Sequence, residues 1–315
     1  MSSSPAARSS EVADHLTLVL KITLVIFIAS SLLDMGLRLD PQDAARGLRN
    51  VRFVGLTLFW GFVASPALAV AVTRVLPLAP SYAMGLLLMG LTPCAPFLPM
   101  IVERAEGDIG YTAAFMLLTS IATIVVMPLA VPLLIEGLTV GAWTIAKPLV
   151  LVALLPLAIG MVLRHLNTIL AMRLQPLVKR TSSLATVAVL VACVVVFGRG
   201  LLGVAGSRAV AAQLIYFAVI TALPYWIGCG LPPDQKIVLS CGMATRNLGV
   251  ALAPLLSLAE VDQRAIVMMV LGLPITVAFA LGAGLLFRHT VVWRAPRSGR
   301  PHARGEDVRD EQLRR

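Results

Sequence analysis

The chain has 315 residues, of which 58% are hydrophobic and only 13% are charged. This composition excludes a soluble globular domain and predicts several membrane-spanning segments. The formal net charge of +10 first suggests a nucleic-acid partner, but the arginines lie between the apolar runs and in the C-terminal tail, as in the cytoplasmic loops of membrane proteins. We therefore exclude nucleic acid and expect membrane lipids around the chain.

Nine apolar runs follow one another and predict an all-α membrane protein with nine transmembrane helices. They cover residues 16–37, 51–75, 82–101, 111–134, 143–163, 182–197, 210–229, 237–258 and 265–287. Helices are expected because only helices and closed barrels satisfy the backbone in lipid, and these runs lack the strict alternation of barrel strands. We predict a flexible N-terminus at 1–13, one transmembrane domain at 14–288 and a disordered basic tail at 289–315.

The distribution of lysine and arginine predicts the orientation in the membrane. One set of connections, together with the C-terminal tail, holds 18 of these residues, whereas the opposite set, with the N-terminus, holds five. Cytoplasmic loops carry the excess of positive charge. We therefore expect the C-terminus in the cytoplasm, the N-terminus outside, and the protein in the plasma (inner) membrane.

Two of the apolar runs are interrupted by residues that break helices. Pro93, Pro96 and Pro99 interrupt the run at 82–101, and Arg246 with Asn247 stands inside the run at 237–258. Broken helices in two halves of a membrane chain mark the binding site of a transporter. Each half has a glycine, a threonine, a break and then an acidic loop, with the two loops on opposite sides, which predicts inverted repeats.

Arg246 is the strongest candidate for a binding residue. A guanidinium near the bilayer centre costs at least about 2.5–3.5 kcal/mol, and the apolar runs offer it few acidic partners. Two roles are open: Arg246 binds an anionic substrate, or it binds carbonyls of the unwound segments and braces the crossing helices. The other candidate substrate-binding residues are Asn247, Thr245, Thr92, Cys94 and Thr112, each of which could instead satisfy backbone groups or pack.

Short motifs between residues 33 and 287 resemble the bile acid:sodium symporter family. They are Met35-Gly-Leu-Arg-Leu39 followed by Asp43, Arg49-Asn-Val-Arg52, Phe62-Val-Ala-Ser-Pro66 and Glu106-Gly-Asp108, together with the two breaks. The resemblance implies a core bundle, in which two discontinuous helices cross at mid-membrane in an inverted-repeat fold, and a panel bundle beside it. The chain looks like a nine-span form that lacks the first helix of the ten-span members.

The chain departs from this family where the resemblance implies sodium ligands. The corresponding positions hold Leu98 and Pro99 in the first break, and Gly61, Thr112 and Met116 on neighbouring helices. In the second break the family's glutamate is absent, and its glutamine is replaced by Arg246. Because hard cations prefer oxygen ligands, we expect no resident metal or cofactor and doubt sodium coupling. Arg246 would then supply permanently the positive charge that sodium supplies in relatives.

The sequence thus predicts a secondary transporter of a small organic anion that works by alternating access. The alternatives are a sodium-coupled bile-acid-like symporter, a non-transporting membrane receptor and an arsenite-type efflux carrier. The last follows from Cys94, because a related arsenite-efflux family has a cysteine in a comparable helix. An enzyme is not expected, since the sequence has no Walker loop, no metal-spaced histidine cluster and no nucleophile with histidine and aspartate partners. The substrate and the oligomeric state stay open.

Overall fold

The computed structural model describes residues 5–134, 141–203, 208–257 and 262–292. Every regular element in these ranges is a helix, which confirms the all-α prediction. The first helix begins at Pro5, inside the segment predicted as flexible, and the last ends at Val292. From residue 293 on, the predicted disordered tail lies outside the described residues.

Helices occupy most of the predicted apolar runs, but those at Pro5–Arg38 and Thr168–Gly203 extend well beyond the runs at 16–37 and 182–197, and the short helix Pro41–Leu48 lies outside every run. In chain order they are α1 (Pro5–Arg38), α2 (Pro41–Leu48), α3 (Val51–Phe59), α4 (Ser65–Val75), α5 (Pro80–Gly90), α6 (Leu98–Arg104), α7 (Ile109–Leu134), α8 (Ala142–Pro148), α9 (Leu155–Leu166), α10 (Thr168–Gly203), α11 (Ala209–Trp226), α12 (Pro233–Ala244), α13 (Leu248–Leu252) and α14 (Gln263–Val292). A 3₁₀ turn, Ala253–Ser257, follows α13.

Two short π-helical segments join helices into longer spans. Trp60–Ala64 links α3 to α4, and Leu149–Leu154 links α8 to α9. Each segment comes just before a proline, Pro66 or Pro156, which cannot donate an amide hydrogen to the turn before it. The wider turn accommodates the missing hydrogen bond without ending the helix, as membrane bundles tolerate.

Five helical segments are long and apolar enough to cross a membrane alone, and the number rises to seven if two bent helix pairs are each one span. This finding establishes a polytopic membrane protein by length and composition. It covers only the described ranges, and the count of nine stays a prediction. α5 and α6 fall below the required length separately because a break divides their apolar run.

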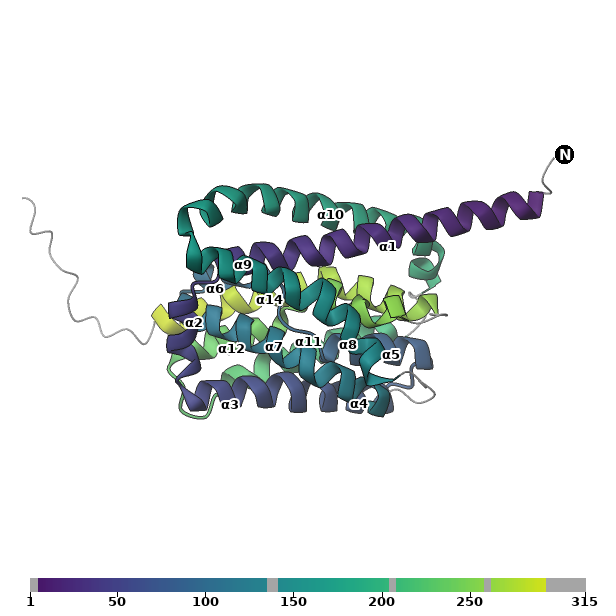
Figure 1. Cartoon of the computed structure of the whole chain (residues 1–315). Helices are drawn as coiled ribbons and strands as arrows, with labels where there is room; N and C mark the ends of the chain where they lie inside the picture. Colours follow the sequence, from purple (N-terminus) through teal and green to yellow (C-terminus); the bar gives the residue numbers. More distant parts are fainter. Residues whose placement is uncertain (1–4, 135–140, 204–207, 258–261, 293–315) are drawn as a thin grey trace, which may run out of the picture.

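Ten of these helices pack as two layers, and α2, α3, α4 and α8 pack against members of the second. In the first, the α1/α9/α10 layer, α1 packs along both α9 and α10, and Figure 1 shows α1 and α10 side by side along one edge of the bundle. The second, the broken-helix layer, contains α5, α6, α7, α11, α12, α13 and α14, which pack on one another. Contacts of α10 with α14 and of α1 with α13 join the layers.

Glycines allow α1 and α9 to approach closely. A Cβ atom at Gly160 would lie 2.7 Å from the Leu33 carbonyl oxygen and 2.9 Å from the Gly36 Cα. We expect Gly160→Ala to force the two helices apart and to lower the free energy of unfolding by about 1–3 kcal/mol. The melting temperature of the detergent-purified protein measures this loss.

Gly55 on α3 provides the matched control, because a Cβ atom there meets nothing within 4 Å. Gly55→Ala is expected to be neutral or stabilising by roughly 0.5–1 kcal/mol, since alanine favours the helix. Equal destabilisation by the two substitutions would contradict the close-packing explanation.

Candidate functional site

The two predicted breaks are present, and they touch. Residues 91–97 are non-helical and separate α5 from α6. Residues 245–247 separate α12 from α13, and the chain bends by 41° there. The backbone N–H of Asn247 donates to the carbonyl of Pro93 at 3.0 Å. A backbone carbonyl that the first break frees is therefore satisfied by a backbone donor that the second break frees.

The Arg246 side chain is buried between the breaks. It is 3% exposed, and its two terminal nitrogens donate at 3.0 Å each, one to the Thr92 carbonyl and one to the Ser65 hydroxyl. The ring of Tyr216 lies 6.0 Å from the guanidinium carbon, within range of a cation–π contact. The Arg246 backbone N–H donates to the Thr276 hydroxyl at 3.2 Å.

Ser65 connects three elements around this guanidinium. Its hydroxyl lies 2.6 Å from the Gly90 carbonyl, which accepts its proton, and 2.7 Å from the Tyr216 hydroxyl. Ser65 itself is fully buried. The network fixes the position of the guanidinium relative to the first break, and no carboxylate forms an ion pair with Arg246 in the described part of the chain.

Two buried donors at the second break lack an acceptor. They are Nε of Arg246 and Nδ2 of Asn247. The other side-chain atom of Asn247, Oδ1, accepts from the Val250 N–H at 3.3 Å and caps α13. An unsatisfied buried donor costs about 1–3 kcal/mol, more when it is charged. A ligand atom that accepts a hydrogen bond from these donors would relieve this cost.

A cavity of about 410 Å³ lies between the two layers and reaches both breaks. α1 and α10 line one side, and the other side is formed by residues 95–97 and 246–248 of the breaks. Its lining includes three cationic residues, Arg38, Lys179 and Arg246, and one acidic residue, Asp34. Asp34 is already paired with Arg38 at 2.9 Å and accepts from Gln175. The uncompensated charge of the lining is positive.

Of the residues predicted as substrate-binding, Arg246 and Asn247 line this cavity. Thr92 and Thr245 are buried, and their hydroxyls donate to carbonyls one turn earlier, those of Met89 and Gly242. The two hydroxyls thus bind carbonyls at the ends of their own helices. The Thr92 carbonyl nevertheless accepts a hydrogen bond from Arg246.

Cys94 and Thr112 lie elsewhere. The Cys94 sulfur faces the Thr119 hydroxyl of α7 at 3.6 Å, and Cys94 is buried. The Thr112 hydroxyl donates to the Asp108 carbonyl at 2.7 Å in the first turn of α7. Neither residue belongs to the lining of the cavity between the layers.

Of the positions where relatives were expected to hold sodium ligands, Leu98, Pro99, Met116 and Gly61 carry no side-chain oxygen, and the Thr112 hydroxyl already donates to the Asp108 carbonyl. Leu98 and Met116 are buried among other hydrophobic side chains. Gly61 has the Met243 methyl as its nearest neighbour, 3.5 Å from where a Cβ atom would lie. Leu98, Met116 and Gly61 therefore offer no side-chain oxygen to a cation.

Three residues around Arg246 were not predicted as site residues: Ser65, Tyr216 and Thr276. The sequence did point to the segment that contains Ser65, because this residue belongs to the Phe62–Pro66 motif of the family resemblance. Tyr216 and Thr276 are isolated polar groups in long apolar helices, and such groups also occur as ordinary packing contacts.

Comparison with known proteins assigns the chain to a family of membrane transporters. The model of the sodium bile acid symporter family matches residues 25–204, more than half of the chain. The protein therefore belongs to the sodium bile acid symporter family. The matched residues include the first break, whereas the second break lies beyond them.

Two plant proteins are similar over most of this chain. A probable sodium/metabolite cotransporter, chloroplastic, of Oryza sativa subsp. japonica (BASS2) is 26% identical over 227 residues, which is 70% of this chain and 54% of the relative. The corresponding BASS1 protein of Arabidopsis thaliana is 24% identical over 238 residues, which is 73% of this chain and 58% of the relative. The chain thus spans little more than half the length of these relatives.

Proposed function

We propose that the protein is a secondary transporter of a small organic anion. The observation that carries this proposal is the cavity between the two layers, where Arg246 and Asn247 contribute positive charge and buried donors without acceptors. A carboxylate, sulfonate or similar anion would accept from both residues. A cation or an apolar molecule would leave these donors unsatisfied.

The two-layer arrangement supports transport by alternating access. In this proposal the α1/α9/α10 layer belongs to the panel, and the broken-helix layer forms the core of an inverted-repeat fold with nine spans. The breaks lie on the core side of the cavity, so rocking of one layer against the other would expose the anion to each side in turn. The excess of lysine and arginine supports a cytoplasmic C-terminus and a plasma-membrane location in this proposal.

Arg246 has a second role in this proposal, because it also braces the breaks. Its hydrogen bonds to the Thr92 carbonyl and the Ser65 hydroxyl orient the guanidinium. Such an arginine supplies a fixed positive charge without a bound ion. The related plant proteins are named as sodium/metabolite cotransporters, whereas we propose that anion binding in this chain needs no sodium.

Uptake into proteoliposomes tests the proposal. The purified full chain is reconstituted and offered matched sets of small organic anions, cations and neutral molecules, with and without a pH gradient. We expect accumulation of at least one anion above protein-free liposomes and none of its neutral or cationic counterparts. Accumulation of cations or neutral molecules alone would overturn the assignment, and binding without any uptake would indicate a receptor.

A further inference from the structure

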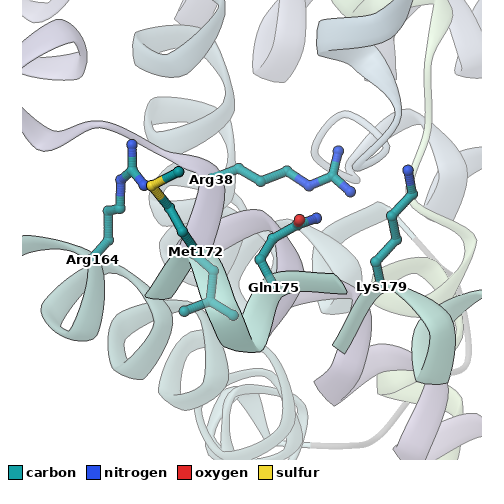
Figure 2. Close-up of a pocket in the computed structure, with 6 residues that line it drawn as sticks. Arg38, Arg164, Met172, Gln175 and Lys179 are labelled. Atoms are coloured by element: carbon teal, nitrogen blue, oxygen red, sulfur yellow. The ribbon is translucent and has the colours of Figure 1, made fainter. Parts of the chain in front are cut away.

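A second pocket lies at the end of the α1/α9/α10 layer where α1 stops. Its volume is about 400 Å³, and it is lined by Leu37 and Arg38 of α1, Arg164 of α9, and Met172, Gln175 and Lys179 of α10. Figure 2 shows Arg164 and Lys179 on opposite sides of the pocket, with Met172 and Gln175 between them and Arg38 extending across. The pocket shares Arg38 and Lys179 with the cavity between the layers, but Arg246 and Asn247 do not line it.

The charges in this pocket are only partly compensated. Asp34 pairs with Arg38 at 2.9 Å and accepts a hydrogen bond from Gln175 at 2.9 Å. This contact holds Arg38 and Gln175 in place and neutralises one positive charge. Arg164 and Lys179 form no ion pair among the residues that the structure describes. Two cationic side chains therefore face one hollow with no anion to balance them.

The surroundings of the pocket combine exposed apolar and cationic side chains. Leu166, Ile169 and Met172 are exposed beside it, at the turn from α9 into α10. Arg173, the next residue after Met172, is also exposed. Apolar side chains next to arginine and lysine at the end of a membrane bundle are typical of the level where lipid headgroups meet acyl chains.

We infer that this pocket binds the phosphate group of an anionic phospholipid. Arg164 and Lys179 would donate to the phosphate oxygens from two sides, and Gln175 adds an amide between them. The acyl chains would lie against Leu166, Ile169 and Met172. A free phosphate would use the same donors but would leave these apolar side chains without a partner.

Lipid binding by the full chain in detergent tests this inference, with native mass spectrometry as the readout. We expect the wild type to retain phosphatidylglycerol in preference to phosphatidylcholine. Arg164→Gln should weaken phosphatidylglycerol binding about fivefold, the effect of one cation near a lipid surface. Arg164→Lys should restore most of it.

Arg173→Gln is the matched control, because it removes the same charge from α10 outside the pocket lining. It should weaken the preference clearly less than Arg164→Gln does, because Arg173 contributes surface charge but no contact inside the pocket. Equal weakening by Arg164→Gln and Arg173→Gln, at equal melting temperatures in phosphatidylcholine, would overturn the site in favour of diffuse surface charge. Displacement of the lipid by equimolar inorganic phosphate would overturn the lipid assignment in favour of a soluble anion.

Discussion

Arg246→Ala is expected to abolish anion uptake and to destabilise the protein. The substitution removes the charge at the second break, the donor to the Thr92 carbonyl and one of the hydrogen bonds of the Ser65 hydroxyl, which keeps its contact with Tyr216. Losing a buried charged partner lowers the binding free energy of the anion by about 2–5 kcal/mol, which is at least about thirtyfold in affinity. The free energy of unfolding should fall by about 1–3 kcal/mol, because buried acceptors lose their hydrogen bonds while the desolvation of the guanidinium is relieved.

Ser65→Ala separates the two roles of Arg246. It removes one bracing hydrogen bond and the contacts of Ser65 with Gly90 and Tyr216, but it keeps the positive charge. If Arg246 binds substrate, Ser65→Ala lowers the melting temperature yet retains more uptake than Arg246→Ala. If uptake and melting temperature fall in parallel in both variants, bracing is the whole role of Arg246.

Asn247→Asp is expected to abolish anion uptake with little change in stability. Aspartate caps a helix about as well as asparagine, so the hydrogen bond to the Val250 N–H is kept. The new carboxylate would lie on the same cavity wall as Arg246 and compete with an anionic substrate. Repulsion and loss of the free positive charge should reduce uptake at least about tenfold. Proteoliposome uptake and melting temperature are measured together.

Asn247→Ser is the control for this prediction. Serine also caps helices but adds no charge. This variant should retain more anion uptake than Asn247→Asp at a similar melting temperature. Full uptake through Asn247→Asp would show that the charge at the second break does not select the substrate.

The interrupted helices could be predicted because their residues conflict with helix or with lipid. Three prolines within seven residues cannot continue a helix, and Arg246 with Asn247 is costly in hydrocarbon unless protein surrounds it. The structure confirms both breaks, at 91–97 and 245–247. It also places Arg246 and Asn247 on the wall of the cavity between the layers.

The partners of Arg246 could not be predicted in the same way. The Thr92 carbonyl is a backbone group, and any residue type at that position would present one. The contact depends on how α12 crosses the first break, which hydrophobic pattern does not specify. Thr92 and Thr245 were predicted as possible ligands from their type alone, but their hydroxyls bond within their own helices.

The number of spans shows a related limit of sequence patterns. Hydropathy averages over a broken run and predicts one crossing at 82–101, but the structure contains 11 and seven helical residues on either side of a break. Neither piece is long enough to cross a bilayer by itself. Whether the two pieces form one crossing depends on their packing against α7 and α14.

The most direct test of the account is the affinity of the purified wild-type protein for its transported anion in sodium-free buffer. Isothermal titration in choline chloride and in sodium chloride gives this affinity. We predict the same dissociation constant in both salts, because Arg246 supplies the positive charge at the site. Binding that appears only in sodium would contradict the claim that the protein's own charge holds the anion.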